Sequence, residues 1–271
     1  MVDREARVLL TFDVDAEALW RTLPNGANRP ALLSQGAYGL REGLPRILAM
    51  LDALGARATF FVPGEVAADH PAPIREIASR GHEVASHGYS HVPLSFIGSA
   101  VEEAEALTKS KNVLEQIIGA EVVGFGAPAC DVSVHTIALL AELGFRYDRS
   151  FLDADRPYVW ADTSPPVIEL PVSWVLDDFS FFGHNIIPRL GWGIRSVREV
   201  ERIWSEELAT SGELGYACLV LHPELSGRKA RADMLLRLMR TLGGVQFTTC
   251  LELADSIGQQ VGLPKKSAVP E

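Results

Sequence analysis

The sequence has few cysteines and no excess of basic residues. Its three cysteines, Cys130, Cys218 and Cys250, lie far apart and form no CxxC pair. This argues against a disulfide framework and favours thiols in a reducing compartment. Acidic residues outnumber basic ones by 35 to 25, which gives a net charge of −10. Because phosphate binding needs a concentrated positive face, we expect neither a nucleic-acid partner nor an anionic-membrane partner.

Targeting and membrane-spanning patterns are also missing. Residues 1–7 are charged and lead directly into an apolar run, with no long signal-type segment or cleavage site. No uninterrupted apolar run approaches the length that crosses a bilayer. We therefore expect a soluble, cytoplasmic protein that works without a membrane.

Several common catalytic motifs are absent. The sequence contains no GxGxxG, no P-loop and no GxSxG, so nucleotide binding and serine hydrolysis have no support. The HExxH helix of metalloproteases is excluded as well, because the histidine after His82-Glu83 is His87, one residue too far along the chain.

Short apolar runs alternate with helical patterns along all 271 residues. The strands that we expect cover residues 8–12, 58–62, 82–86, 122–125, 145–147, 167–171, 217–221 and 245–247. Such alternation is typical of parallel strands in a single α/β domain. We take this domain as residues 1–271, with a frayed tail at 264–271. Seven or eight strand–helix units favour a closed or nearly closed barrel over an open sheet.

Two long segments are expected to be loops. Residues 19–42 contain Trp20 with several prolines and glycines, and residues 173–195 contain Trp174 among other aromatic residues. Loops of this length are often functional. The aromatic segment fits a hydrophobic cluster beneath a loop and a wall of a substrate pocket equally well.

Two histidines follow the strand predicted at residues 82–86. His87 and His91 lie four residues apart in a polar turn with Gly88 and Pro93. Neutral imidazoles are the commonest metal ligands, but a pair needs a third ligand to hold a divalent ion. The pair alone is therefore a weak motif.

Carboxylates follow the first predicted strand. Asp13 and Asp15 come directly after residues 8–12, at the end of a strand where α/β folds place their chemistry. The competing interpretation is a solvated turn or a helix N-terminus, which also favours acids. Either interpretation puts Asp13 and Asp15 near the histidine pair if the strands are parallel.

A third strand end carries His222, after residues 217–221, and Asp177 and Asp178 lie in the aromatic segment. Two histidines and one carboxylate form a three-ligand zinc site with an open position for water. A second carboxylate could accept the proton of that water, and a lone histidine could protonate the leaving group. This set predicts metal-assisted hydrolysis of an amide or ester.

These residues resemble the motifs of the polysaccharide deacetylases, the NodB-homology or carbohydrate esterase 4 family. The first two motifs resemble Thr11-Phe12-Asp13-x-Asp15 and Ser86-His87-x-x-x-His91-x-Pro93, and the last resembles Leu221-His222-Pro223. The resemblance covers residues 8–255. It implies a distorted (β/α)7 barrel with parallel strands and a divalent metal, usually zinc.

The resemblance also implies roles for individual residues. Asp15, His87 and His91 would be the metal ligands, Asp13 the catalytic base and His222 the general acid. In the fourth motif an aspartate tunes the acid histidine, and we assign this role to Asp178, although Asp177 is placed almost equally well. Three further residues are expected to contact substrate: Trp20, Trp174 and Pro128.

The sequence departs from the family pattern at two places. Val14 separates Asp13 from Asp15, where the family has adjacent aspartates followed by glycine. The third motif usually carries an arginine that orients the base, and here Gly126-Ala127-Pro128 lacks it. The sequence does not show what replaces that arginine.

These departures, together with the missing signal peptide, resemble an intracellular branch of the family. That branch includes peptidoglycan-deacetylase-like proteins and hydrolases of allantoin or cyclic imides, often as homotetramers. We therefore expect a homo-oligomer that deacetylates an N-acetyl sugar or polysaccharide. The alternatives are ring opening of a cyclic amide, imide or allantoin, and a non-catalytic sugar-binding protein on the same barrel.

Overall fold

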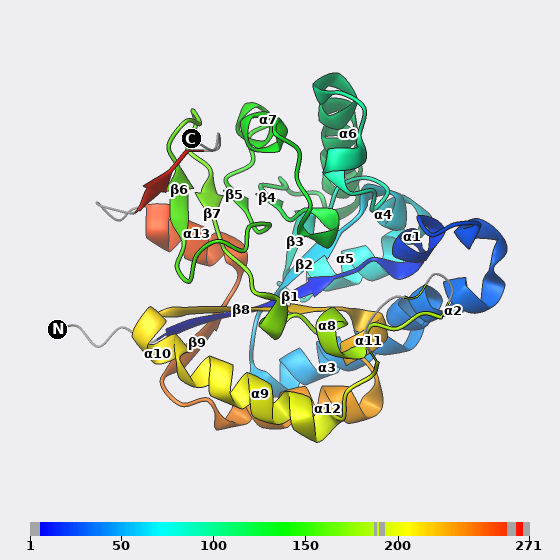
Figure 1. Ribbon diagram of the computed structural model, residues 1–271, viewed down its shortest axis with the longest axis vertical. Coiled ribbons are helices and arrows are strands. Elements are labelled where there is room, and N and C mark those ends of the chain that lie inside the picture. The colour runs from blue at the N-terminus through cyan, green and yellow to red at the C-terminus, as the bar shows by residue number, and fades with distance from the viewer. Residues whose placement is uncertain (1–5, 187–188, 190–192, 259–263, 268–271) are drawn as a thin grey trace. The chain divides into compact units, whose positions relative to one another are not determined.

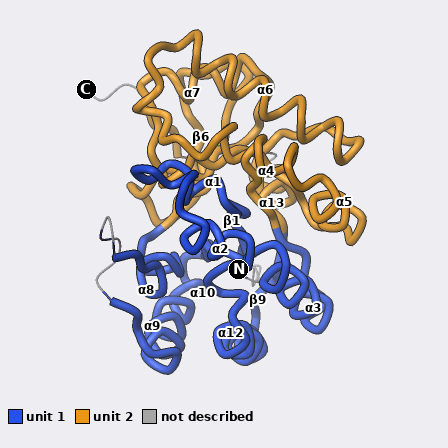
Figure 2. Tube along the Cα trace, turned by 90° about the vertical axis from the view of Figure 1, so that its right-hand side faces the viewer, with its two compact units in different colours: residues 1–58, 173–248 blue, residues 59–172, 249–271 orange. Residues whose placement is uncertain are grey.

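The structure is a computed structural model that describes residues 6–186, 189, 193–258 and 264–267 (Figure 1). The chain forms two compact units, each built from separate segments (Figure 2). Unit 1 comprises residues 1–58 and 173–248, and unit 2 comprises residues 59–172 and 249–271. Because neither unit is one continuous stretch of sequence, the units are not consecutive domains. The expectation of one catalytic domain stays a prediction.

The sheet of unit 1 is built around its first strand. Strand β1 (Ala6–Asp13) pairs in parallel with β8 (Tyr216–Leu221) and β9 (Val245–Thr248). Its apolar side chains are almost completely buried, as a strand in a parallel sheet requires. Phe12 lies opposite Leu221, so Asp13 and His222 follow at the same end of adjacent strands.

Helices α3 (Leu44–Leu54), α9 (Val197–Ala209) and α12 (Lys229–Thr241) cover one side of this sheet (Figure 1). Helix α12 packs against both α3 and α9. Each helix presents an apolar stripe inward; in α3 it consists of Ile47, Leu48 and Leu51. Unit 1 also contains the short helices α10 (Ser211–Leu214) and α11 (Pro223–Ser226).

The predicted loop at 19–42 is wrong, because most of this segment is helical. It contains α1 (Ala16–Arg21), a 3₁₀ turn (Gly26–Asn28), α2 (Pro30–Tyr38) and a π-helical turn (Gly39–Gly43). Pro30 occupies the first position of α2, where a helix needs no N–H donor. Gly36 lets α2 approach the carbonyl oxygen of Ala16, which a Cβ atom would overlap. The residues that suggested a loop therefore start helices and let them pack closely.

Unit 2 contains a second set of mainly parallel strands. In spatial order these are β2 (Thr59–Val62), β3 (Glu83–Ser86), β4 (Gly124–Phe125), β5 (Tyr147–Asp148), β7 (Ile168–Glu169), β6 (Tyr158–Trp160) and β10 (Lys265–Lys266). Only the β6–β7 pairing is antiparallel among the pairings described for this unit. The strand predicted at 122–125 is shorter than expected.

The described part of unit 2 also contains the helices α4 (Gly64–Asp69), α5 (Pro71–Ser79), α6 (Ala100–Ile118), α7 (Thr136–Glu142) and α13 (Cys250–Gly258). Helix α6 packs against α4, α5, α7 and β3. Its first turn is capped by Ser99, whose hydroxyl accepts from the N–H of Glu102 at 3.3 Å.

Two further expectations are revised in part. The tail was expected to fray from residue 264, but Lys265 and Lys266 pair with β6, while residues 268–271 lie outside the described residues. The aromatic segment contains a 3₁₀ turn (Trp174–Leu176) and α8 (Phe179–Phe182), and its residues 187–188 and 190–192 also lie outside. Among the described helices, none combines the length and apolarity needed to cross a bilayer.

Candidate active site

A buried histidine–aspartate pair stands at the end of β8. His222 Nδ1 lies 2.7 Å from Asp178 Oδ1, and the backbone N–H of His222 donates to Asp178 Oδ2 at 2.9 Å. Ser226 Oγ donates to the same carboxylate. Asp178 thereby fixes both the ring and the backbone of His222, and the other ring nitrogen, Nε2, lies 3.7 Å from Asp15 Oδ2.

The neighbouring aspartate is placed differently. Asp177 Oδ1 accepts from the N–H of Phe179 at 2.7 Å and so starts α8. Asp177, Asp178 and His222 each offer a ligand-type atom within 4.8 Å of the others. The hydrogen bonds favour Asp178 over Asp177 as the partner of the histidine.

The electrostatic surroundings hold His222 in its charged form. Burial alone would lower the pKa of His222, but Asp178, and after it Asp15 and Asp177, raise that pKa well above its usual value. Burial raises the pKa of Asp177 to about 7, against the opposing effect of His222. An imidazolium that is stable at neutral pH can act as a proton donor.

Both carboxylates predicted at the end of the first strand are buried. Asp13 is the last residue of β1 and is 5% exposed, and Asp15 is 1% exposed at the start of α1. The next residue, Ala16, has φ 46°, in the left-handed region. Backbone strain of this kind is typical of functional sites. Burial and strain both argue against the solvated turn that the sequence left open.

An acid that sequence reasoning missed lies in α11. Glu224 is 3% exposed, and neither of its carboxylate oxygens has a hydrogen-bond partner among the described residues. Burial, followed by the charge of Asp15, raises the pKa of Glu224 to about 8. The only sequence signal was its place two residues after His222.

In unit 2, both predicted ligand histidines follow β3. His87 is 1% exposed, and its Nδ1 lies 2.7 Å from the carbonyl oxygen of Gly126. A carbonyl can only accept, so Nδ1 carries the proton and the lone pair of the neutral ring lies on Nε2. Such a bond from the second ring nitrogen is typical of metal-binding histidines.

The second histidine of the pair faces the first. The ring centroids of His87 and His91 are 5.3 Å apart, with an angle of 66° between the ring planes. His91 is 6% exposed and has φ 57°, another left-handed residue in a polar turn. Two buried imidazoles at this separation suit a metal that also takes a carboxylate ligand.

The residues predicted to contact substrate differ in exposure. Trp20 in α1 is fully buried, and Pro128 is buried in the turn after β4. Trp174 is 50% exposed and can present a ring surface to solvent. Their roles in substrate binding stay predictions.

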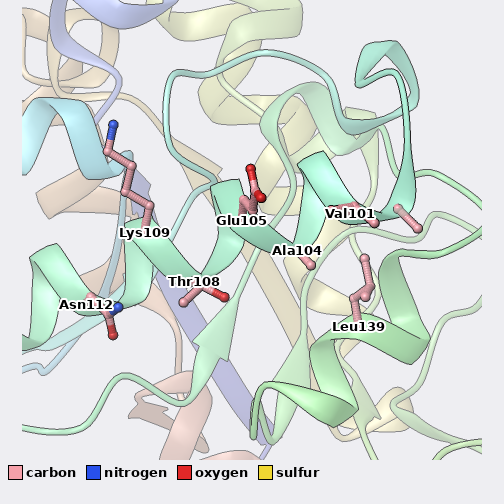
Figure 3. A pocket seen from close by; sticks show the side chains of 8 residues that line it. Val101, Ala104, Glu105, Thr108, Lys109, Asn112 and Leu139 are labelled. Atoms are coloured by element: carbon pink, nitrogen blue, oxygen red, sulfur yellow. The ribbon is translucent and has the colours of Figure 1, made fainter.

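A surface hollow on unit 2 contains none of these residues. Its volume is about 610 Å³, and it lies between α6 and Leu139 of α7 (Figure 3). Small and aliphatic side chains such as Val101 and Ala104 supply most of its wall, with Glu105 and Lys109 at its edge. It offers no histidine or aspartate for the predicted chemistry.

Comparisons with known proteins agree with these observations. The protein-family model described as polysaccharide deacetylase matches residues 2–147, just over half of the chain. A peptidoglycan deacetylase of Helicobacter pylori is 28% identical over 283 aligned positions, which cover 93% of this chain and 96% of that protein.

Solved structures extend the likeness to the whole chain. The structure of a putative polysaccharide deacetylase of Mycobacterium smegmatis matches with a TM-score of 0.92 and 37% identity, over 99% of this chain and 96% of that one. The structure of an allantoinase matches with a TM-score of 0.81 and 20% identity, over 94% of this chain and 90% of that one. At this identity the likeness shows the fold alone.

These matches confirm the predicted fold, a distorted (β/α)7 barrel of the NodB-homology type. They also confirm the predicted enzyme class, a deacetylase-like hydrolase of non-peptide carbon–nitrogen bonds. The chain belongs to the polysaccharide deacetylase family.

Proposed function

We propose that the protein is a metal-dependent deacetylase that removes acetyl groups from the N-acetyl sugars of a polysaccharide. The observation that carries this proposal is the buried His222–Asp178 pair, which follows β8 at the same strand end as Asp13. A charged histidine and an acid at neighbouring strand ends provide a proton donor and a proton acceptor for one amide bond.

Asp15, His87 and His91 are the proposed metal ligands. One carboxylate and two imidazoles are a donor set that zinc accepts readily, and the Nδ1 bond of His87 leaves its lone pair on Nε2. When bound, the ion supplies Lewis-acid polarisation of the substrate carbonyl and lowers the pKa of water.

Two side chains of unit 1 move the protons. Asp13 accepts a proton from the attacking water, whose oxygen forms the new bond to the acetyl carbon. His222 gives the proton on Nε2 to the sugar nitrogen as the carbon–nitrogen bond breaks. The products are acetate and a free amino sugar, and Asp178 holds the ring of His222 in place throughout.

The test measures acetate release from the N-acetylglucosamine tetramer with added zinc. We expect His222→Ala and Asp13→Asn each to lower kcat by about 10²–10⁴-fold, the usual contribution of a general acid or base. The control is His135→Ala, at an exposed histidine in the turn before α7.

A fully active Asp13→Asn protein would show that Asp13 is not the catalytic base. A parallel screen should offer hydantoins, imides and allantoin to the same variants. Turnover of these rings without acetate release would favour the ring-opening alternative, and no turnover of any substrate would favour a sugar-binding protein.

The oligomeric state is tested separately. Light scattering measures the molar mass of the protein in solution, and we expect the mass of a homo-oligomer.

A further inference from the structure

A second hollow lies in unit 1, between helix α2 and the segment that follows α8 (Figure 1). Its volume is about 450 Å³. Pockets for small ligands commonly have volumes of about 300–1,000 Å³. The lining combines one guanidinium, two side-chain amides and aliphatic groups, and it includes Arg29, Pro30, Leu32, Gln35, Asn185 and Ile186. Such a mixture suits a ligand that has polar groups and an apolar face.

Both walls of this hollow leave the sheet of unit 1 at the carboxyl ends of adjacent strands. Helix α2 lies in the connection that follows Asp13 of β1 and leads to α3. Asp177 pairs in parallel with Val220 of β8, so the chain after it passes the carboxyl end of β8 before it reaches Asn185. Because α/β folds bind ligands outside the carboxyl ends of their strands, the hollow lies on the side of unit 1 that carries Asp13 and His222.

Helix α2 separates the hollow from the proposed proton donor. Arg29 directly precedes α2, and Gly39 directly follows it. A Cβ on Gly39 would lie 3.1 Å from Oε2 of Glu224, which is two residues after His222. The nine residues of α2 extend over about 13 Å. A ligand in the hollow therefore lies beyond the bond that is cut, where a further sugar unit of the same chain would reach.

The hollow contains a cation that nothing in the described chain neutralises. The guanidinium of Arg29 forms no hydrogen bond or ion pair with a described residue, and the same holds for the side-chain amide of Gln35. Other arginines of unit 1 are paired: Arg202, for example, contacts Glu206 at 2.7 Å. Among the described residues that line the hollow, Arg29 alone is charged. In a chain with a net charge of −10, this is a local site for an anion.

We propose that this hollow is a subsite for a second sugar unit of the substrate, and that Arg29 binds a carboxylate on that unit. The inference rests on the proposed function, and it narrows the substrate to an acidic N-acetylated polysaccharide. The planar fork of arginine offers a carboxylate two parallel N–H donors. One guanidinium balances one carboxylate. A phosphate monoester carries about two charges at neutral pH, and no second cation is among the described lining residues.

The remaining lining fits a sugar ring. The amides of Gln35 and Asn185 can donate hydrogen bonds to hydroxyl groups and accept from them. Ile186 is 75% exposed, and with Leu32 it supplies an apolar wall for the C–H face of the ring. These aliphatic groups also exclude part of the water around Arg29, which strengthens a charge-assisted hydrogen bond relative to one at an open surface.

The first test measures binding independently of catalysis. The probe is a hexasaccharide in which N-acetylglucosamine alternates with glucuronic acid, and the control ligand is the same hexasaccharide with methyl-esterified carboxylates. Titration calorimetry should show that the wild type binds the acid about tenfold more tightly than the ester, as one charge-assisted hydrogen bond allows. Arg29→Gln should remove this difference. Arg29→Lys keeps the charge without the fork and should retain part of it.

The second test follows acetate release from the same two ligands. In the wild type we expect the KM of the acid to be about tenfold below that of the ester with a similar kcat, because Arg29 lies away from the bond that breaks. Arg29→Gln should raise the KM of the acid about tenfold and that of the ester much less. Ile186→Ser should weaken binding of both ligands, since the apolar wall contacts the ring and not the charge.

The control variant is Arg202→Gln, which removes an exposed arginine of α9 and should leave the preference for the acid unchanged. Melting temperatures show that each variant is folded. Equal affinity of the wild type for acid and ester would overturn the inference, as would a preference that persists in Arg29→Gln. Acetate release from the N-acetylglucosamine tetramer would then still support the proposed function. Binding of the acid that depends on Arg29, without acetate release from any ligand, would overturn the proposed function and leave the carboxylate subsite in place.

Discussion

At the scale of single residues, the hydrogen bonds distinguish two adjacent aspartates that the sequence could not separate. Asp178 bonds the ring and the backbone of His222, whereas Asp177 bonds the backbone of Phe179. Both residues occupy equivalent places in the motif, and only the direction of each side chain decides the role. The sequence predicted the pair and assigned the role to Asp178 without a contact to exclude Asp177, and the hydrogen bonds favour that assignment.

Replacing Asp178 should change the pH dependence of catalysis. Asp178 raises the pKa of His222, so Asp178→Asn lowers that pKa and reduces the fraction of imidazolium at a given pH. The proton donor is lost as pH rises through this pKa. We therefore expect the alkaline limb of the kcat profile to move to lower pH by about one unit or more.

The matched variant is Asp177→Asn, which removes a charge at a similar place without touching the His222 ring. It should move the alkaline limb less than Asp178→Asn does. The measurement is acetate release from the N-acetylglucosamine tetramer between pH 5 and pH 10. An equal or larger shift in Asp177→Asn would reverse the assignment of the two aspartates.

At the scale of elements, the strands were predicted well and the segment at 19–42 was not. Buried parallel strands are continuous apolar runs, such as residues 8–12, and they are recognisable without tertiary information. The helices α1 and α2 contain glycine and proline, which resemble loop residues when their packing is unknown. The close contact between Gly36 and Ala16 explains the glycine and appears only in three dimensions.

Gly36→Ala should destabilise unit 1 through this contact. The new Cβ would overlap the carbonyl oxygen of Ala16, which is backbone and cannot rotate away. We expect the free energy of unfolding to fall by about 1–3 kcal/mol, the usual cost of overpacking. Urea unfolding followed by circular dichroism measures it.

The control for this variant is Gly212→Ala in α10. No heavy atom lies within 4 Å of a Cβ built there, so the substitution should be neutral or slightly stabilising. Since α1 directly follows Asp15, Gly36→Ala should also weaken activity. Equal stability of the two variants would contradict the packing argument.

The contribution of the β5–β7 pair to the free energy of unfolding depends on pH. Asp148 and Glu169 lie opposite each other in register and are fully buried. Burial raises the pKa of Asp148 to about 6, and burial with the Asp148 charge raises the pKa of Glu169 well above its usual value. Between the unfolded and folded pKa values the folded protein binds more protons, so its stability falls as pH rises.

Asp148→Asn removes one of these titrations and keeps an acceptor for Ser150 Oγ. Between pH 5 and pH 8 we expect the wild type to lose about 1–2 kcal/mol more unfolding free energy than the variant. Asp155→Asn, at an exposed aspartate, should follow the wild type. Urea midpoints at both pH values measure this, and parallel curves for the wild type and Asp148→Asn would show that Asp148 ionises normally.

At the scale of the whole molecule, the family and fold were predictable because the motifs are spread along the chain in order. Asp13, His87 and His222 lie at the ends of strands that were each recognisable from their apolar runs. We expect substrate choice to depend on segments such as 173–195, whose shape could not be predicted from the sequence. This is why the reaction type is better defined than the substrate.

Zinc should stabilise the folded protein, because the proposed ligands come from parts of the chain that are far apart in sequence. A ligand that binds only the folded state at 100 times its Kd adds about 2.7 kcal/mol to the free energy of unfolding. After dialysis against a chelator, added zinc should therefore raise the melting temperature of the wild type. His91→Ala removes one proposed ligand and should abolish the rise, while His135→Ala should retain it. The same rise in melting temperature in His91→Ala would show that zinc binds elsewhere than at the histidine pair, whatever the activity of the enzyme.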